Sequence, residues 1–284
     1  MSLALPQGAR ADILARHRDA IAGSRRTRLF TVATIVGLLG LFIYGWSTFE
    51  VSLWRILSGF SNLGTFVVLM LPPDPGSATR AMLFLKALGE TVAIAFLGTL
   101  LAAVLAFPLG FLAARNVVAN RIIHFLARRS LDTVRGVDAL IWALIWVNVV
   151  GLGPFAGMLA IMTSDIGAFG KLFSEAIEAA DSKPVEGVTA SGGSRLHEIR
   201  VGLIPQVLPV IASQVLYYFE SNTRSSTIIG IVGAGGIGLY LAETIRTLEW
   251  QQVSFLILLI LAAVSLIDFV SGKLRFAIIG KRAV

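Results

Sequence analysis

An unbroken stretch of uncharged residues, from Leu29 to Phe49, is the feature that most restricts the fold of this chain. A helix needs about 20 mainly apolar residues to cross the roughly 30 Å hydrocarbon core of a bilayer, and this stretch is long enough. The remaining sequence agrees, because 56% of the residues are hydrophobic and only 14% are charged. In ordinary soluble domains about a quarter of the residues are charged. We therefore predict an all-α, polytopic integral membrane protein.

Further apolar runs predict about six transmembrane helices in total. The expected spans are residues 29–49, 88–114, 131–150, 155–173, 203–219 and 253–269. Two further segments, 50–86 and 228–242, contain apolar runs that are too short or too interrupted to cross, and we expect them to be interfacial or re-entrant. The predicted domains are a basic N-terminal tail (1–28), a transmembrane domain (29–276) and a C-terminal tail (277–284).

The basic residues predict which side of the membrane each segment faces. Lys and Arg are enriched in the cytoplasmic segments of membrane proteins, and 19 of the 24 in this chain fall on one predicted side. That side contains both tails, which we therefore expect to be cytoplasmic. Because the basic residues mostly lie at the ends of apolar runs, they favour membrane lipid rather than nucleic acid as a partner. The arginine-rich residues 1–28 are expected to contact anionic lipid.

A polar loop, residues 182–205, lies between two apolar runs on the same predicted side. Lys183-Pro184 predicts the start of a short helix, since proline is well tolerated in the first turn, and Gly192-Gly193 predicts its end. Ser194 is a good N-cap for a second short helix that contains Arg195. Two short helices joined at a glycine bend are suited to docking a partner protein.

This polar loop resembles the cytoplasmic EAA loop of ABC-importer permeases. In that family a glutamate is followed six residues later by glycine and thirteen residues after that by proline, and Glu186, Gly192 and Pro205 have both spacings. The sequence departs from the family in having Gly187 and Val188 where two alanines are usual.

Three other passages are similar to the permease subunits of phosphonate importers, namely residues 149–157, 171–178 and 224–238. The resemblance covers about residues 30–276 and implies a type I ABC-importer permease fold. One more departure is Gly202, which stands where the family often has a branched apolar residue.

The resemblance implies a permease subunit of an ATP-driven importer for phosphonate or a related phosphorus oxyanion, in a bacterial inner membrane. The implied partners are a dimer of separate ATPase subunits, an extracytoplasmic phosphonate-binding protein and a second copy of this chain. The polar loop would sit in a groove of the ATPase, so that closure of the ATPase dimer moves the spans. The residues implied in this coupling are Pro184, Glu186, Gly187, Gly192, Arg195 and Pro205.

Polar residues near or within the spans are predicted to line the translocation pathway or its gate, because ionisable groups inside a membrane are costly and usually face a cavity or a partner. Glu220 and Arg224 are also spaced for a helical ion pair, and both interpretations of Arg224 remain open. The candidate pathway residues are Glu90, Asp165, Asn222, Arg224, Ser225, Ser226 and Thr227.

Other kinds of chemistry are not indicated. The chain has no cysteine and only three scattered histidines, so we expect no metal site. The G-x-G-x-x-G pattern at Gly233–Gly238 joins two apolar segments. This position favours close packing of helices, or lining of the translocation path, over dinucleotide binding. Because the chain has no phosphate-binding P-loop, ATP and Mg²⁺ are expected on the partner ATPase, with no cofactor and no catalytic residue here. The alternative function is an ion- or proton-coupled secondary transporter, with coupling through Asp165, Glu90 or Arg224.

Overall fold

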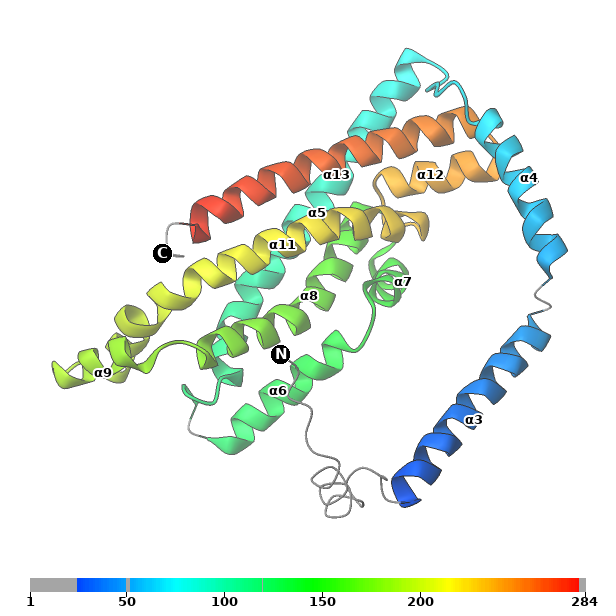
Figure 1. Cartoon of the computed structure of the whole chain (residues 1–284). Helices are drawn as coiled ribbons and strands as arrows, with labels where there is room; N and C mark the ends of the chain where they lie inside the picture. Colours follow the sequence, from blue (N-terminus) through cyan, green and yellow to red (C-terminus); the bar gives the residue numbers. More distant parts are fainter. Residues whose placement is uncertain (1–24, 50–51, 119, 281–284) are drawn as a thin grey trace, which may run out of the picture. The chain divides into compact units, whose positions relative to one another are not determined.

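The structure, a computed structural model, describes residues 25–49, 52–118 and 120–280. Every regular element in these ranges is a helix (Figure 1). The elements are α3 (Arg25–Thr48), α4 (Leu53–Leu69), α5 (Ala78–Ala113), α6 (Arg121–Arg135), α7 (Ala139–Val150), α8 (Pro154–Glu178), α9 (Ser182–Ala190), α10 (Arg195–His197), the π-helical segment η1 (Glu198–Leu203), α11 (Ile204–Ile231), α12 (Ile237–Arg246) and α13 (Trp250–Ile279). The chain divides into two compact units, residues 1–65 and 66–284.

The first unit contains α3, which confirms the predicted span over residues 29–49. Its 24 residues have no polar face, since apolar side chains occur all around the helix. A helix of this kind is stable when apolar surroundings cover every side, as lipid does in a membrane.

The second unit is built around α8, which packs against α5, α6, α7 and α11 (Figure 1). Small residues bring α5 and α8 close together. A Cβ added at Gly98 would lie 2.8 Å from the Cβ of Ile161, and one added at Gly110 would lie 2.8 Å from the Cβ of Phe173. Membrane helices commonly use glycine and alanine in this way, because close contact replaces the hydrophobic effect as the source of attraction.

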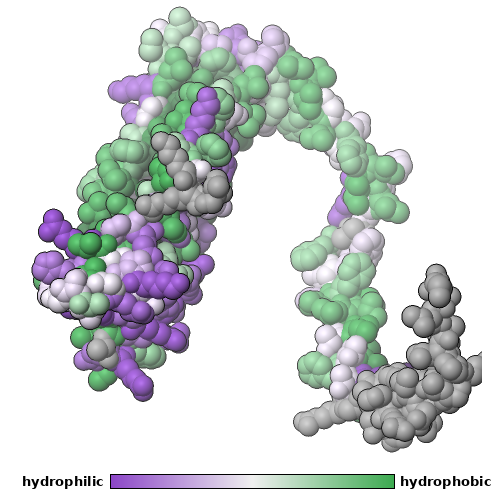
Figure 2. Space-filling view, turned by 60° about the vertical axis from the view of Figure 1, so that its left-hand side comes forward, coloured by the Kyte–Doolittle hydropathy of each residue, from purple (hydrophilic) through white to green (hydrophobic). Residues whose placement is uncertain are grey.

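The outer surface of the second unit is largely apolar. Figure 2 shows most of its hydrophilic surface at the lower end and smaller hydrophilic patches at the upper end, with mainly hydrophobic surface between them. On α13, for example, Leu258, Leu261 and Leu266 have exposed fractions of 52%, 56% and 64%. Exposed apolar surface of this extent is expected where lipid is the surrounding solvent.

Each of the six predicted spans overlaps a helix, but the spans are not equivalent. Four helical stretches of the described chain are long and apolar enough to cross a membrane, and the number is five if the bent pair α6–α7 is counted as one span. The remaining predicted span is α8, which has 25 residues but includes Asp165 and Lys171. Because twelve residues of α8 are buried within the protein, it can carry polar side chains that lipid would exclude.

The prediction of one continuous span over residues 131–150 was wrong. The helix axis turns by 86° between α6 and α7, after Gly136 ends α6. Asp138 starts a new helix, because its Oδ1 accepts a hydrogen bond from the backbone N–H of Leu140 at 2.8 Å. Such an N-cap satisfies a backbone donor that a continuous helix would have used internally.

Several predicted boundaries also differ from the structure. Helix α5 begins at Ala78 rather than at residue 88. The Ser77 hydroxyl caps this start by accepting a hydrogen bond from the N–H of Arg80. Within segment 50–86, α4 has 17 residues and falls below the length of a span. Residues 277–279 belong to α13 and not to a tail. Residues 1–24 and 281–284 of the predicted tails lie outside the described ranges, and residues 25–28 belong to α3.

Residues 228–242 were predicted to form one interfacial or re-entrant segment, but the structure divides them between two helices. Helix α11 continues to Ile231, and α12 begins at Ile237. Between them is a glycine turn, residues 232–236, in which Gly233, Gly235 and Gly236 have φ values of +97°, +82° and +73°. Residues with a Cβ rarely adopt this conformation, so the glycines determine where the helix ends.

The predicted close packing at the G-x-G-x-x-G pattern is confirmed. The N–H of Gly153 donates to the carbonyl oxygen of Gly233 at 3.0 Å, and a Cβ at Gly235 would lie 2.6 Å from the nitrogen of Pro154. The N–H of Ile237 donates to the hydroxyl of Thr91 at 2.8 Å. The glycine turn therefore joins α11 and α12 to the first turn of α8 and to α5.

Candidate functional site

The first half of the polar loop forms the helix predicted for it. Asp181 caps α9 by accepting from the N–H of Lys183 at 3.1 Å, and Pro184 lies in the first turn. At the other end Gly192 has φ +81°. The N–H groups of Gly192 and Gly193 donate to the carbonyls of Thr189 and Val188. This is the hydrogen-bond pattern of a Schellman motif, which ends a helix at glycine.

The second half of the polar loop differs from the prediction. Ser194 is the N-cap of α10, as expected, but α10 has only three residues and continues through η1 into α11. The prediction of a separate second helix was therefore wrong. Pro205 is the second residue of α11, directly after the wider π-helical segment.

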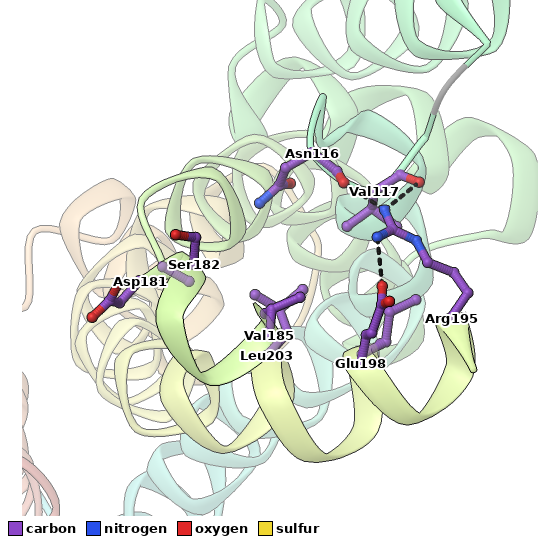
Figure 3. Close-up of a pocket in the computed structure, with 10 residues that line it drawn as sticks. Asn116, Val117, Asp181, Ser182, Val185, Arg195, Glu198 and Leu203 are labelled. Carbon is purple, nitrogen blue, oxygen red and sulfur yellow. Dashed lines mark hydrogen bonds and ion pairs between the residues drawn. The ribbon is translucent and has the colours of Figure 1, made fainter. Parts of the chain in front are cut away.

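A small cavity of about 130 Å³ separates the polar loop from the end of α5 (Figure 3). Its lining includes Asn116, Val117, Asp181, Ser182, Val185, Arg195, Glu198 and Leu203. The Arg195 guanidinium reaches across the cavity and donates to the carbonyl oxygens of Asn116 and Val117, at 2.6 and 3.4 Å. It also donates to Glu198 Oε2 at 2.8 Å. Arg195 therefore fastens the polar loop to the segment that follows α5.

The contact with Arg195 also affects the charge of Glu198. The guanidinium lowers the pKa of the Glu198 carboxyl below its ordinary value, and the Thr189 hydroxyl, which donates to Oε1 at 2.9 Å, acts in the same direction. Both donors favour the ionised carboxylate. The charged pair lies within one helical stretch, and the Thr189 hydroxyl connects it to α9.

Two residues that sequence analysis missed also fix the polar loop. The amide of Gln206 accepts from the N–H of Asp181 at 3.1 Å and donates to the carbonyl of Gly202 at 2.6 Å. The Asn116 amide donates to the carbonyl of Ile177 at 2.8 Å. Gly202 itself explains one departure from the family pattern, because a Cβ there would lie 3.0 Å from the Cα of Val185. Glycine at this position lets α9 pack directly against η1.

The outer side of the polar loop is exposed. Glu186 is exposed on α9, where it accepts a hydrogen bond from the Ser182 hydroxyl at 2.7 Å. Apart from its chain neighbours and the backbone of α9, no atom of the described residues lies within 4 Å of a Cβ built at Gly187. Leu196 and Val201 have exposed fractions of 77% and 59%. A carboxylate, an open backbone position and two apolar side chains are thus available on one rigid loop.

A second group of predicted residues meets in the interior of the helical bundle. Asn222 of α11 donates to the Thr99 hydroxyl of α5 at 2.8 Å and to the Asp165 carboxylate of α8. The Ser226 hydroxyl donates to the carbonyl oxygen of Asn222 at 2.7 Å. These four residues, here named the polar cluster, are all buried. The cluster links three helices through side chains that apolar packing alone would not join.

Arg224 lies outside the polar cluster and is half-exposed, at 47% of its side chain. It forms the predicted ion pair with Glu220, at 3.6 Å, and a second one with Asp268, at 3.4 Å. Glu220 also pairs with Arg275 at 2.6 Å. These contacts connect α11 to α13. The other pathway candidates, which are Glu90, Ser225 and Thr227, are partly buried and also lie outside the polar cluster.

Replacing Asn222 by alanine is expected to lower the stability of the folded chain by about 1–3 kcal/mol, the usual cost of leaving a buried polar partner unsatisfied. The Asp165 carboxylate and the Thr99 hydroxyl would both lose their contact with the Asn222 amide. Thermal unfolding of the purified protein in detergent measures the effect. Ser225→Ala, a change outside the polar cluster, is the control and should shift the midpoint little. Equal midpoints for the two variants would contradict a supporting role for Asn222.

Comparison with known proteins shows which family the chain matches and which solved structures share its fold. The family described as "Binding-protein-dependent transport system inner membrane component" matches residues 106–278. The chain is 41% identical over 256 residues to a putative phosphite transport system permease protein of Stutzerimonas stutzeri, covering 90% of this chain and 89% of the relative. It is 38% identical over 216 residues to a phosphate-import permease protein of Mycolicibacterium smegmatis, covering 76% of this chain and 40% of the relative.

A third relative is a putative cryptic phosphonate transport system permease protein of Escherichia coli, 51% identical over 118 residues, with 42% of this chain and 97% of the relative covered. Among solved structures, a methionine ABC transporter in an inward-facing conformation matches 71% of this chain and 99% of its own chain. The TM-score is 0.62 and the sequence identity 19%, so this similarity concerns the fold alone.

Proposed function

Since the chain belongs to the family of binding-protein-dependent transport system inner membrane components, we propose that it is the permease subunit of an ATP-driven importer for phosphonate, phosphite or phosphate. The substrate class is taken from relatives whose names refer to these three phosphorus oxyanions. A permease of this kind binds no nucleotide and catalyses no reaction itself. A separate pair of ATPase subunits and an extracytoplasmic binding protein complete the transporter.

The observation that carries this proposal is the shape of the polar loop. Its inner side is held to the chain by Arg195, while its outer side exposes Glu186. A loop that its own contacts already order loses less conformational entropy when a partner binds it. We assign contact with the ATPase to Pro184, Glu186, Gly187, Gly192 and Pro205, with Arg195 holding the loop in position.

The same assignment gives the orientation in the membrane. Since ATPase subunits act in the cytoplasm, the polar loop and both termini belong on that side, in agreement with the distribution of Lys and Arg. Two copies of the chain would enclose the pathway. We assign to the pathway or its gate the residues Glu90, Asp165, Asn222, Arg224, Ser225, Ser226 and Thr227.

Reconstitution in lipid vesicles tests the proposal. Vesicles that contain this chain, its ATPase and its binding protein should accumulate phosphite, methylphosphonate or phosphate only when ATP is supplied on the side of the ATPase. Sulfate is the control anion. Accumulation driven by a proton gradient in vesicles that contain this chain alone would overturn the proposal and favour a secondary transporter.

A further inference from the structure

A second, strongly basic cavity of about 660 Å³ lies at the junction of α5 and α6. Its volume is within the range of about 300–1,000 Å³ that is typical of ligand sites. The charged and titratable residues of its lining are Arg115, Arg121, His124, Arg128, Arg129 and Asp132. Four arginines and one acidic residue thus line a space that the proposed transport function does not use.

The positive charge of this basic cavity is only partly neutralised. Arg128 pairs with Glu178 at 3.0 Å and with Glu175 at 4.0 Å, and Arg129 pairs with Asp132 at 3.5 Å. Glu178 also accepts a hydrogen bond from the backbone N–H of Arg115 at 2.9 Å. Within the described ranges, no carboxylate lies within 4 Å of the guanidinium of Arg115 or Arg121. Each guanidinium presents five N–H donors in a planar fork that matches the oxygens of a phosphate group. Arg115 and Arg121 are therefore available to bind an anion.

His124 provides a third unused group in the wall of the basic cavity. Its Nδ1 is buried and has no hydrogen-bond partner among the residues that the structure describes. Buried polar atoms normally have a partner, and a ring nitrogen can donate to an oxyanion in the appropriate tautomer. His124 therefore has a ring nitrogen without a hydrogen-bond partner beside the basic cavity.

Apolar side chains next to the basic cavity show what kind of anion it suits. On α6, Ile122, Phe125 and Leu126 have exposed fractions of 70%, 57% and 58%. A helix with a basic face and an exposed apolar face lies in the interface of a membrane. A ligand bound here would place its anionic group beside the arginines and an apolar portion beside these three side chains.

We propose that the basic cavity binds the phosphodiester headgroup of an anionic glycerophospholipid. Arg115 and Arg121 hold the phosphate oxygens, and the acyl chains lie along the apolar face of α6. A soluble phosphorus oxyanion has the same anionic chemistry but gains nothing from the apolar face, so the two sources can be separated. Basic pockets between membrane helices are known to take phospholipid headgroups.

Native mass spectrometry of the purified full chain in detergent tests this proposal. The chain is incubated with phosphatidylglycerol or phosphatidylcholine, and the lipid molecules that remain bound are counted. The unmodified chain should retain phosphatidylglycerol in preference to phosphatidylcholine. The double change Arg115→Gln and Arg121→Gln should weaken retention of phosphatidylglycerol about 30-fold, as expected from the loss of two arginines near a membrane surface. Arg115→Lys with Arg121→Lys keeps the charge and should retain most of the lipid.

The matched control is the double change Lys86→Gln and Arg246→Gln, which removes two exposed charges elsewhere on α5 and α12. This control should leave the retention of phosphatidylglycerol unchanged. Equal losses in the two glutamine variants would mean that the lipid is held only by the overall positive charge of the protein, and would overturn the proposal. Millimolar inorganic phosphate should not displace the lipid from the unmodified chain. Displacement by phosphate would instead assign the basic cavity to a soluble oxyanion. None of these measurements depends on ATP-driven uptake, so the proposed function can fail independently.

Discussion

Replacing Gly238 by alanine is expected to prevent the chain from accumulating as a folded protein. A Cβ at this position would overlap the backbone carbonyl oxygen of Thr227 and would lie 3.0 Å from the Cα of Gly230. Both obstacles are backbone atoms of α11, so no side-chain rotation can remove the clash. Overpacking of a well-packed core usually costs about 1–3 kcal/mol, and we expect at least the upper end of this range here, because two helices must separate.

The effect of Gly238→Ala can be measured as the yield of monodisperse protein after extraction into detergent and as the midpoint of its thermal unfolding. Gly272→Ala is the matched control, since Gly272 lies within α13 and no atom is within 4 Å of its built Cβ. That change should leave the yield unaltered or raise it slightly, because alanine favours helix more than glycine does by about 1 kcal/mol. Equal yields and midpoints for the two alanine variants would contradict the conclusion that close packing of Gly238 against α11 stabilises α12.

Replacing Glu186 by lysine is expected to reduce ATP-dependent uptake by at least about 30-fold, while the chain still inserts and folds. Truncating one partner of a buried charged pair at a protein interface costs about 2–5 kcal/mol, and reversing the charge adds repulsion. Folding should be unaffected because Glu186 is exposed and its only described side-chain contact is with Ser182. The loss would therefore occur in the contact with the ATPase.

Uptake by reconstituted vesicles and the rate of ATP hydrolysis are the two readouts for Glu186→Lys. Glu243→Lys is the matched control, since Glu243 is an exposed glutamate on α12, outside the polar loop. It should transport normally. Unchanged uptake in the Glu186 variant, with normal amounts of protein in the membrane, would contradict the proposed role of the polar loop in coupling.

Sequence analysis succeeded where the structural signal is local. The limits of α9 follow from Pro184 and Gly192, each of which acts within a few residues of its own position. The predicted fold, that of a type I ABC-importer permease, is confirmed by the similarity to the methionine transporter over 71% of this chain. The bend between α6 and α7 was missed even though Asp138 is a good N-cap, because the apolar run around it suggested an uninterrupted span.

Contacts between distant parts of the chain could not be predicted. Arg195 binds carbonyl groups 78 and 79 residues away, and Asn222 joins Asp165 across 57 residues. Backbone carbonyls occur at every position, so nothing in the sequence singles out Asn116 as the acceptor. For the same reason sequence analysis grouped Arg195 with the exposed coupling residues, whereas the structure gives its side chain partners within the chain.

The continuity of the helix from Arg195 to Ile231 has a mechanical consequence. These 37 residues form one uninterrupted stretch, which at 1.5 Å per residue is about 55 Å long. The polar loop lies at one end of this stretch and the glycine turn at the other. A tilt of about 10° around its midpoint would shift each end by roughly 5 Å in opposite directions, by the same helix geometry. In the proposed transporter, a displacement of α9 would therefore be passed along this stretch to the glycine turn.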